Sequence, residues 1–514
     1  MIIKAINLIF SHKTYLGCLI LSLIIALIIT PLIARLAKKL GIIDLPGARK
    51  IHTKEVPRMG GIAIFIALWT PILLLYFWEN RISQSFEERW WEIAIIALAG
   101  SAVMLSGLLD DMRGLNAWEK LLVQVPIAFL FSWYIARFDS ISVPGFGEFS
   151  LGIWSVPVTM LWIVGITNAF NLIDGIDGLA AGVAFIVAIT NGIISAIAGN
   201  QFMAVIMFSL SGACLGFLRY NFTPARIFLG DSGSLLLGMS LATVSVSAYS
   251  KSNIVASFFV AVIILGYPMA DTLIAMIRRK FYGKPIFSAD LGHIHHRLLA
   301  KGLDHPKAAL IIYSFCMALS ALALGLVLEN SLMTFIAVLL LTIMVSLGVY
   351  FLGFFRMFRV RRVRETKSKY LIAYHLAELL LAKLALVDTL EQIYALLEQA
   401  GKEFGFQGIE VRLNPARAPA GQNLNYLWEN SSVREIEPKS GQAPVQLKNF
   451  LIPGEFLEAR FCYDSKGMEE ELREEYLVQL ERLVKNANQR IKEIYSQNNL
   501  IKTPSKQAKN SGAL

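Results

Sequence analysis

Apolar runs of about 20 residues recur along the first two thirds of the chain, and short polar segments separate them. An α-helix needs a run of about this length to cross the hydrocarbon core of a membrane. The pattern therefore predicts an all-α polytopic membrane protein with about 11 transmembrane helices. We expect these helices to begin near residues 15, 59, 91, 119, 153, 178, 201, 232, 253, 307 and 331.

The composition supports this class. Of the 514 residues, 55% are hydrophobic and 17% are charged, whereas a soluble domain has about 25% charged residues. The mean hydropathy is correspondingly high, at +0.55. The first apolar run, from Tyr15 to Ala34, has no convincing small-residue cleavage site, so we expect it to remain in the membrane.

The charge and the cysteines narrow the class further. In a membrane protein the net charge of +10 reflects cytoplasmic loops and lipid headgroups, so membrane lipid is an expected partner and nucleic acid is not. The cysteines predict neither a metal site nor a disulfide framework, because they are scattered at Cys18, Cys214, Cys316 and Cys462.

Basic residues in three loops orient the predicted helices by the positive-inside rule. The loops follow the first, ninth and eleventh spans, and the first of them carries Arg35, Lys38, Lys39, Arg49, Lys50, Lys54 and Arg58. All three lie on one side if the N-terminus is outside and the C-terminus is cytoplasmic. The acidic segments and the histidine cluster described below then share that side. We therefore predict a multi-pass protein of the cell inner (plasma) membrane with these acidic segments and histidines on the cytoplasmic face.

The composition changes near Tyr370, where membrane-length apolar runs stop and charge rises. We expect a soluble cytoplasmic α/β domain there, with an amphipathic helix over 370–402, short strands within 407–464, a loop over 414–423 and a charged helix over 468–497. The predicted division is a transmembrane domain (1–355), a basic juxtamembrane linker (356–369), the α/β accessory domain (370–500) and a disordered tail (501–514).

The stretch from Ala169 to Ala181, AFNLIDGIDGLAA, places polar residues at the end of an apolar run. Carboxylates beside hydrocarbon are costly, so their presence indicates a function. Gly175 and Gly178 disfavour an unbroken helix. We therefore expect a polar helix end whose carboxylates face a positive group. A polar residue recurs every three positions at Asn168, Asn171, Asp174 and Asp177. Neighbouring members of this series can share a helix face, but Asn168 and Asp177 cannot, because each step of three turns the helix by roughly 300°.

Two further acidic segments lie beside predicted spans. GLLDDMRGLNAWEK (107–120) carries Asp110 and Asp111, and Lys120 follows nine positions later. Alone, this pair is more typical of a solvated loop, but the other acids on the same face favour a site. RIFLGDSGSLLLG (226–238) carries Asp231 in a glycine-rich turn where a backbone can approach a phosphate. A capped helix start without further function explains this turn equally well.

LGHIHHRL (291–298) contains three histidines within four residues. His293 and His296 are three positions apart and would share a helix face. A surface cluster and a zinc site are the alternatives, although no cysteine lies nearby to complete a zinc site. Anion binding is favoured because Arg278, Arg279 and Arg297 are close in the sequence.

Several carboxylates without thiolates suit Mg²⁺, or Mn²⁺, rather than zinc or copper. Magnesium, carboxylates and basic side chains are the groups that phosphoryl transfer requires, because charge on the phosphate oxygens must be neutralised. A site at the membrane face predicts that one substrate is a lipid.

Six segments together resemble the polyprenyl-phosphate N-acetylhexosamine-1-phosphate transferases, which belong to glycosyltransferase family 4. This family includes the peptidoglycan phospho-N-acetylmuramoyl-pentapeptide transferase and a eukaryotic dolichyl-phosphate counterpart. The HIHHRL form is more similar to the undecaprenyl-phosphate N-acetylglucosamine (GlcNAc) branch. The segments cover roughly residues 15–350 in the family's order: VPRMGGIAIF (56–65), GLLDDMRGLNAWEKLLVQ (107–124), NAFNLIDGIDGLAAG (168–182), NFTPARIFLGDSGSLLLG (221–238), YPMADT (267–272) and ADLGHIHHRL (289–298).

The resemblance implies a Mg²⁺-dependent phosphoglycosyl transferase. A UDP-N-acetylhexosamine, with GlcNAc favoured over GalNAc or another modified sugar, would give its sugar 1-phosphate to undecaprenyl phosphate and release UMP. This would be the first membrane step of a cell-envelope polysaccharide pathway, such as that of lipopolysaccharide or teichoic acid.

The resemblance also implies roles for residues. Asn171 and Asp231 would be the metal ligands. Asp110 and Asp111 would position or deprotonate the lipid phosphate, and Lys120 would hold phosphate. The nucleotide side would be supported by Asp174 and Asp177, the diphosphate contacted by His293, His295 and His296, and substrate bound by Arg58 and Asn168. A lipid phosphate oxygen is a competent nucleophile, so direct attack is favoured, and a two-step route through a carboxylate stays open.

Two alternatives belong to other classes. An ion-coupled membrane transporter predicts acids near the middle of a span, and Asp271, near the inner end of the ninth span, is the main candidate. A membrane sensor whose tail does the work would leave the six segments unexplained. The domain over 370–500 is faintly similar to a GAF-type sensory fold, but an accessory or dimerisation domain explains it as well, which leaves a homodimer open.

Overall fold

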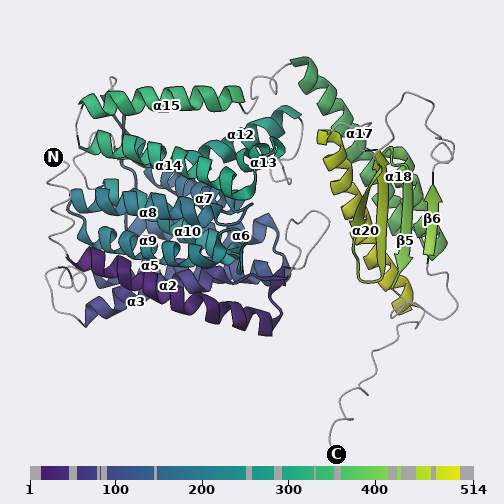
Figure 1. The fold of residues 1–514 in the computed structure, drawn as a ribbon, viewed down its shortest axis with the longest axis horizontal. Coiled ribbons are helices and arrows are strands. Elements are labelled where there is room, and N and C mark those ends of the chain that lie inside the picture. The colour runs from purple at the N-terminus through teal and green to yellow at the C-terminus, as the bar shows by residue number, and fades with distance from the viewer. Residues whose placement is uncertain are drawn as a thin grey trace, which may run out of the picture. The chain divides into compact units, whose positions relative to one another are not determined.

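The structure is a computed structural model in which the chain divides into two compact units (Figure 1). The first unit contains residues 1–45, 54–278 and 286–356, and the second contains 46–53, 279–285 and 357–514. The structure describes residues 13–44, 55–77, 82, 89–143, 147–250, 257–282, 292–328, 331–351, 360–414, 425–429, 447–464 and 470–497.

The first unit is a bundle of helices, and a helix begins close to each start that the hydropathy pattern predicted (Figure 1). The described helices are α2 (Lys13–Leu40), α3 (Gly60–Tyr76), α5 (Trp90–Arg113), α6 (Ala117–Tyr134), α7 (Ser155–Ile173), α8 (Leu179–Ile197), α9 (Gln201–Asn221), α10 (Gly230–Ser250), α11 (Ser257–Ile264), α12 (Gly266–Tyr282), α13 (Ile294–Ala300), α14 (His305–Val327) and α15 (Ser331–Phe351).

Length and hydropathy make this unit a multi-pass membrane protein. Among the described residues, 6 helices are long and apolar enough to cross a membrane, or up to 7 if α11 and α12 form one span. The apolar helices Gly60–Tyr76 and Val338–Phe351 are shorter. The full set of about 11 crossings and their orientation stay predictions.

The predicted ninth span is not one continuous helix. α11 and α12 are bent by 78° relative to each other. Pro268 has no N–H to donate to the carbonyl of Ile264, and Gly266 lowers the helix propensity at the same place. Both residues are visible in the sequence segment GYPMAD, so the break has a local cause.

Small residues bring the central helices into close contact. α9 packs against α2 and α8, and most of its residues are buried. Gly212 and Gly216 are four positions apart on α9, and a Cβ at these positions would lie 2.1 Å from the Leu19 carbonyl oxygen and 2.6 Å from the Leu23 carbonyl oxygen. Such a small-xxx-small pattern allows two membrane helices to touch along their backbones.

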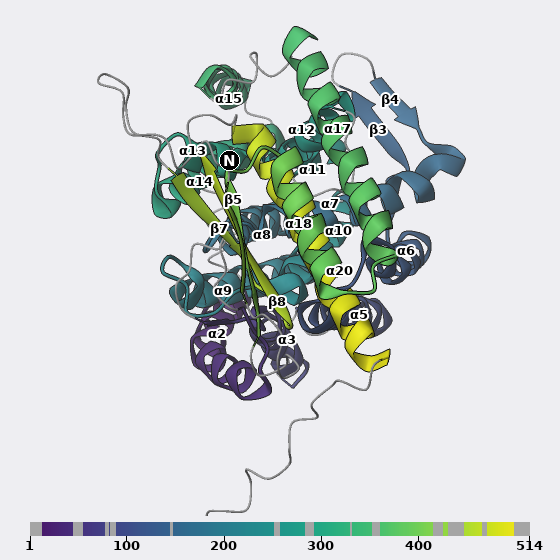
Figure 2. The ribbon, with the colours of Figure 1, turned by 90° about the vertical axis from the view of Figure 1, so that its right-hand side faces the viewer.

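The first unit also contains short strands that the prediction of an all-α domain missed. β1 (Ile43–Asp44) pairs with β2 (Val56–Pro57). β3 (Ser140–Val143) and β4 (Gly147–Ser150) form a hairpin that follows α6 and precedes α7 in the chain (Figure 2). A 3₁₀ turn, η1 (Gly152–Trp154), then leads into α7. These pieces are too short to produce a readable alternation of apolar and polar positions.

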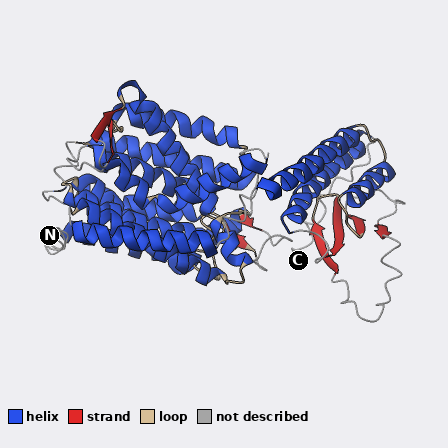
Figure 3. Ribbon diagram, turned by 90° about the horizontal axis from the view of Figure 1, so that it is seen from above, coloured by secondary structure: helices blue, strands red, loops and turns tan. Residues whose placement is uncertain are grey.

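The second unit is a four-stranded antiparallel sheet with helices on one side of it (Figure 3). The strand order is β6-β5-β8-β7, with Val411 paired to Ala459 in the centre. Its core is a separate apolar cluster that includes Leu397, Phe461 and Val484. The elements are α17 (Val360–Ala385), α18 (Leu390–Glu403), β5 (Gly408–Leu413), β6 (Asn425–Glu429), β7 (Leu447–Ile452), β8 (Leu457–Asp464) and α20 (Glu470–Gln497).

Two boundaries of this unit differ from the prediction. The helix expected over 370–402 is two helices, because Thr389 caps α18 by accepting the Gln392 N–H at 3.4 Å. α17 begins at Val360, so most of the segment predicted as a linker is helical. Residues 356–359 of that linker, 415–423 of the predicted loop and the tail over 501–514 lie outside the described residues.

Candidate active site

The first turn of α10 is held by a carboxylate from another helix. Asp111, near the end of α5, accepts the Asp231 N–H on Oδ1 at 3.0 Å and the Ser232 N–H on Oδ2 at 3.2 Å. The first N–H groups of a helix have no partner within the helix, so an acid placed there satisfies them and matches the positive end of the helix dipole. Asp111 therefore fixes the position of Asp231.

Lys120 joins two acids that come from different helices. Its Nζ lies 2.5 Å from Asp231 Oδ2 and also forms an ion pair with Asp110. The chain reaches this position because Gly114, at φ 70°, ends α5. α6 then starts in a capping box, in which Asn116 accepts the Glu119 N–H at 3.0 Å and Glu119 accepts the Asn116 N–H at 2.7 Å.

Two glycines allow these segments to meet, and the sequence reasoning gave them no role. A Cβ at Gly107 of α5 would lie 2.4 Å from the Asp231 carbonyl oxygen. A Cβ at Gly61 of α3 would lie 2.4 Å from the Gly233 backbone nitrogen. Both positions accept only hydrogen, because any side chain would push α5 or α3 away from the start of α10. In the sequence, the one indication of this requirement was that both glycines lie within the motif segments.

Arg58 lies at the same end of the bundle. Its Nη2 is 3.0 Å from Asp44 Oδ1, and a backbone bridge to Phe228 links it to the segment before α10. Its positive charge acts on the carboxylate of Asp174. Arg58 is therefore a partly exposed cation at the edge of the acidic region.

The four polar residues that recur every three positions point to different partners. Asn168 Nδ2 donates to Gln124 Oε1 at 2.6 Å, whereas Asn171 Nδ2 donates to Ser234 Oγ at 2.9 Å. Asp177 Oδ2 accepts the Ala225 N–H at 3.0 Å. Among the described residues, the partner of Asp177 is thus a backbone N–H and not a charged side chain, and the expectation that the carboxylates face a positive group stays a prediction. α7 ends at Ile173, so the series does not continue along one helix.

Asp174 lies among other acids. Burial raises the pKa of its carboxyl to about 8, and the negative charges of Asp231 and Asp111 contribute in the same direction. Arg58 opposes this shift and does not cancel it. In such surroundings the ionised carboxylate is unfavourable unless a proton or a cation compensates its charge.

The histidine turn consists of His293, His295 and His296. His293 precedes α13 as its N-cap residue, so it stands just outside the helix on which it could share a face with His296. The His293 and His295 rings stack with centroids 5.7 Å apart, and the His295 and His296 centroids are 4.3 Å apart. A Cβ at Gly175 would lie 2.2 Å from His295 Nε2. The histidine turn therefore contacts the acidic stretch directly.

Burial keeps His295 uncharged. It is 1% exposed, and burial with the neighbouring His296 lowers the pKa of its imidazole to about 3. Neither of its ring nitrogens has a hydrogen-bond partner among the described residues. Arg278 and Arg297 both donate to the carbonyl of Gly292, at 2.6 Å and 3.2 Å, and so stabilise the backbone that enters the turn. Residues 289–291 of this motif lie outside the described residues.

The oxygen donors of the acidic region suit a hard divalent cation. Asp110, Asp111, Asp174 and Asp231 outnumber the basic side chains Lys120 and Arg58 that act on them. The described residues contain no group of three or more His, Cys, Asp or Glu already arranged as metal ligands. A magnesium site would need one carboxylate to exchange Lys120 for the cation.

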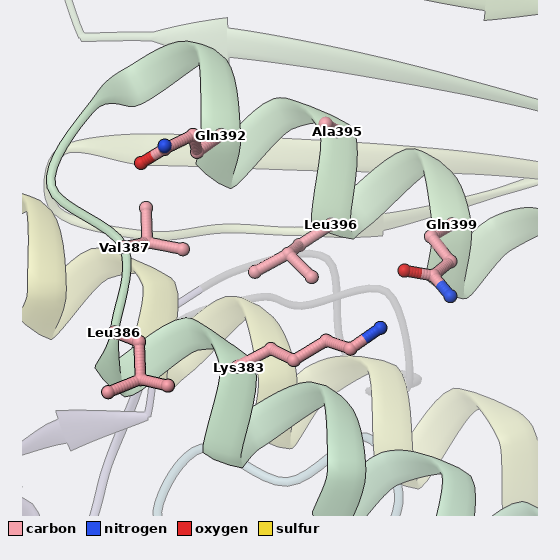
Figure 4. A pocket seen from close by; sticks show the side chains of 7 residues that line it. All are labelled: Lys383, Leu386, Val387, Gln392, Ala395, Leu396 and Gln399. Atoms are coloured by element: carbon pink, nitrogen blue, oxygen red, sulfur yellow. The ribbon is translucent and has the colours of Figure 1, made fainter.

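The second unit contains a pocket whose lining differs from the acidic region, because it has no carboxylate or histidine. It has a volume of about 300 Å³ and opens between the end of α17 and α18 (Figure 4). None of the six motif segments contributes to it. Its lining is mostly apolar with one lysine and two glutamines, namely Lys383, Leu386, Val387, Gln392, Ala395, Leu396 and Gln399.

The fold and the site define a class: a multi-pass membrane protein whose acidic and basic side chains meet where several helices begin and end. A sequence model of glycosyl transferase family 4 matches residues 93–249, which contain three of the six motif segments.

Relatives cover more of the chain than the family model does. A probable undecaprenyl-phosphate N-acetylglucosaminyl 1-phosphate transferase of Bacillus subtilis is 41% identical over 309 residues, or 59% of this chain and 83% of the relative. A decaprenyl-phosphate N-acetylglucosaminephosphotransferase of Mycobacterium tuberculosis is 36% identical over 300 residues, or 54% and 74%. A phospho-N-acetylmuramoyl-pentapeptide-transferase of Lactiplantibacillus plantarum is 34% identical over 280 residues, or 52% and 83%. The chain therefore belongs to glycosyl transferase family 4 and is a transferase.

Proposed function

We propose that this protein transfers N-acetylhexosamine 1-phosphate, with GlcNAc as the sugar, from a UDP-sugar to undecaprenyl phosphate and releases UMP. The names of two similar proteins state N-acetylglucosamine and a polyprenyl phosphate. The observation that carries the proposal is the convergence of Asp110 and Asp231 on Lys120, since phosphoryl transfer needs fixed charges around the phosphate oxygens.

The reaction needs no covalent enzyme intermediate. A phosphate oxygen of the lipid attacks the β-phosphorus of the UDP-sugar, and the bond from that phosphorus to the oxygen bridging to the α-phosphate breaks, so that UMP leaves. Holding two anionic substrates together is the main task of the protein. Lys120 supplies a positive charge for the phosphates, and Asp110 orients that ammonium group.

The geometry separates the roles of the adjacent acids. Both oxygens of Asp111 accept N–H groups of α10, so we assign Asp111 to the position of Asp231 rather than to proton transfer. Asp110 accepts the Leu115 N–H on Oδ1 and pairs with Lys120 through Oδ2, so we assign it, together with Lys120, to the lipid phosphate. Asp174 and Asp177 support the loop on the nucleotide side, and Arg58 and the histidine turn contribute to binding of the donor.

Asp231 and Asn171 would hold Mg²⁺, with Mn²⁺ as a substitute. The ion would neutralise negative charge on the diphosphate during transfer. The chemistry of the donors fits, because carboxylate and amide oxygens are the ligands that Mg²⁺ prefers. A direct readout of binding is thermal unfolding in detergent: Mg²⁺ should raise the melting temperature of the wild type and leave that of Asp231→Asn unchanged.

We further propose that the active site faces the cytoplasm from the inner (plasma) membrane, because UDP-sugars are made there. The pathway would be that of a cell-envelope polysaccharide. An ion-coupled transporter is not favoured, since Asp271, the acid on which that alternative depends, is buried and paired with His293.

The test is UMP release by the purified protein with undecaprenyl phosphate and a panel of UDP-sugars. UDP-GlcNAc should be turned over fastest, and UMP release should require the lipid acceptor. Asp139→Asn is a suitable control, because this exposed acid pairs with Arg137 outside the site. If no UDP-N-acetylhexosamine supports UMP release, the proposed function is wrong.

A further inference from the structure

Asp271 is a buried acid that the proposed chemistry leaves without a task. It lies in the second turn of α12, just after the bend, and is 1% exposed. Its Oδ2 is 2.7 Å from His293 Nδ1, and its Oδ1 accepts the Ile294 N–H at 2.7 Å. A carboxylate buried in an apolar bundle is costly unless both of its oxygens are satisfied, as they are here.

This contact determines which nitrogen of His293 is available. An ionised carboxylate only accepts hydrogen bonds, so the proton of the Asp271–His293 contact lies on Nδ1. Among the described residues the other nitrogen, Nε2, has no hydrogen-bond partner. The side chain of His293 is 5% exposed, so the ring has little freedom to turn. A carboxylate that holds Nδ1 in this way fixes both the tautomer and the plane of an imidazole.

The ring of His293 is connected to the acidic region through one neighbour. It stacks on His295 with an angle of 10° between the planes, and His295 Nε2 contacts Gly175 in the loop that carries Asp174 and Asp177. A shift of the His293 ring would therefore reach the side of the site that we assign to the nucleotide.

We propose that Asp271 is a positioning residue that holds the His293 ring so that Nε2 is presented to the diphosphate of the UDP-sugar. In the doubly protonated ring both nitrogens donate, so Asp271 takes one N–H and leaves the other for a phosphate oxygen. Asp271 itself touches no substrate. The identity of the ligand rests on the proposed function. The competing explanation is that Asp271 only caps α13 through the Ile294 N–H.

A double-mutant cycle in the full-length protein separates the two explanations. Asp271→Asn keeps an oxygen for the Ile294 N–H and removes the carboxylate from Nδ1. His293→Asn keeps an amide near the Nδ1 position and removes Nε2. Each change alone should lower kcat/KM for UDP-GlcNAc by about 10- to 100-fold, mainly through KM. The double variant should lose no more kcat/KM than the more damaging of the two single variants, because both changes remove the same interaction. If the two losses multiply, Asp271 acts independently of the ring and the proposal is wrong.

Asp304→Asn is the matched control for capping. Asp304 caps α14 by accepting the Lys307 N–H at 3.0 Å, and this pair is exposed. Its kcat/KM should equal that of the wild type. A loss as large as that of Asp271→Asn would show a general effect of replacing a capping aspartate by asparagine and would contradict the proposal.

Calorimetric titration with UDP-GlcNAc, without the lipid acceptor, makes the inference independent of turnover. A wild type that binds UDP-GlcNAc and releases no UMP refutes the proposed function only. In that case the same cycle measured in Kd should still be non-additive. Additive changes in Kd, unchanged binding by Asp271→Asn, or a wild type that does not bind UDP-GlcNAc would each overturn the inference.

Discussion

The acidic cluster (Asp110, Asp111, Lys120 and Asp231) and the histidine turn both lie where membrane helices begin or end, yet different forces hold them. In the acidic cluster, side chains from α5, α6 and α10 meet around a single ammonium group, and negative charge remains in excess. In the histidine turn, His293 and His295 are buried, and Asp271 holds Nδ1 of His293.

The difference indicates a division of labour. The acidic cluster is electrostatically incomplete, so a cation or an anionic substrate held by a cation can complete it. The histidine turn is held by ring stacking and by the Asp271 contact, and it contributes the orientation of the His293 ring. Changes to charge should therefore affect the acidic cluster most, and changes to shape should affect the histidine turn most.

Among the changes that test this comparison, the largest effect should follow from removing the ammonium group. Lys120→Met leaves Asp110 and Asp231 to repel each other and removes a cation from the phosphates, so kcat should fall by about 100- to 1000-fold. Steady-state UMP release measures this. Lys307→Met is the control, because Lys307 pairs with Asp304 on the exposed start of α14. If Lys120→Met keeps activity within twofold of the wild type, the proposed role of Lys120 at the phosphates is wrong.

A change of shape should test the contact between the two regions. The Cβ of Gly175→Ala would lie 2.2 Å from His295 Nε2, so the buried ring must move. A displacement of this kind should lower kcat/KM by about 10- to 100-fold. Gly165→Ala, where a Cβ meets nothing within 4 Å, should leave it unchanged. Equal activity of both variants would mean that the histidine turn and the acidic stretch work independently.

A smaller effect should appear in the pH dependence of stability. The pKa of Asp174 is raised to about 8 in the folded protein, against about 3.9 in an unfolded chain. The protonated form thus stabilises the fold below about pH 4, and this contribution is lost as the pH rises toward 8. In detergent with EDTA, the melting temperature of the wild type should fall more between pH 5 and pH 8 than that of Asp174→Asn. Parallel curves would contradict the raised pKa.

The smallest effect should follow from removing the second unit. All six motif segments lie before residue 299, and the unit has its own apolar core. Because α17 begins at Val360, a stop codon after residue 356 avoids leaving part of that helix, as a stop after Lys369 would. We expect UMP release within about twofold of the full-length protein. A well-folded but inactive truncation would show that the second unit belongs to the catalytic machinery.

The sequence predicted the features that depend on local pattern. Apolar runs located the helix starts, and the orientation from the basic loops placed the segments that carry Asp110, Lys120 and Asp231 on one face. In the structure these three residues form ion pairs. The bend before α12 was also readable, because Pro268 and Gly266 stand at the break, but a count of apolar residues does not register it.

Contacts between distant segments could not be predicted in this way. Asp271 and His293 are 22 positions apart, and nothing local indicates that they meet. The regular spacing of the acidic stretch suggested a shared face, but Asn168 bonds to α6 and Asn171 to α10, because α7 packs between these helices. The requirement for glycine at positions 61 and 107 depends in the same way on the backbone of α10.

The most direct test of the central claim is UMP release from UDP-GlcNAc and undecaprenyl phosphate by wild type and Asp231→Asn, each measured with Mg²⁺ and with EDTA. The wild type should release UMP only when the lipid and Mg²⁺ are both present, and Asp231→Asn should be slower by about 1000-fold or more. Near-normal turnover by a folded Asp231→Asn variant would contradict the account.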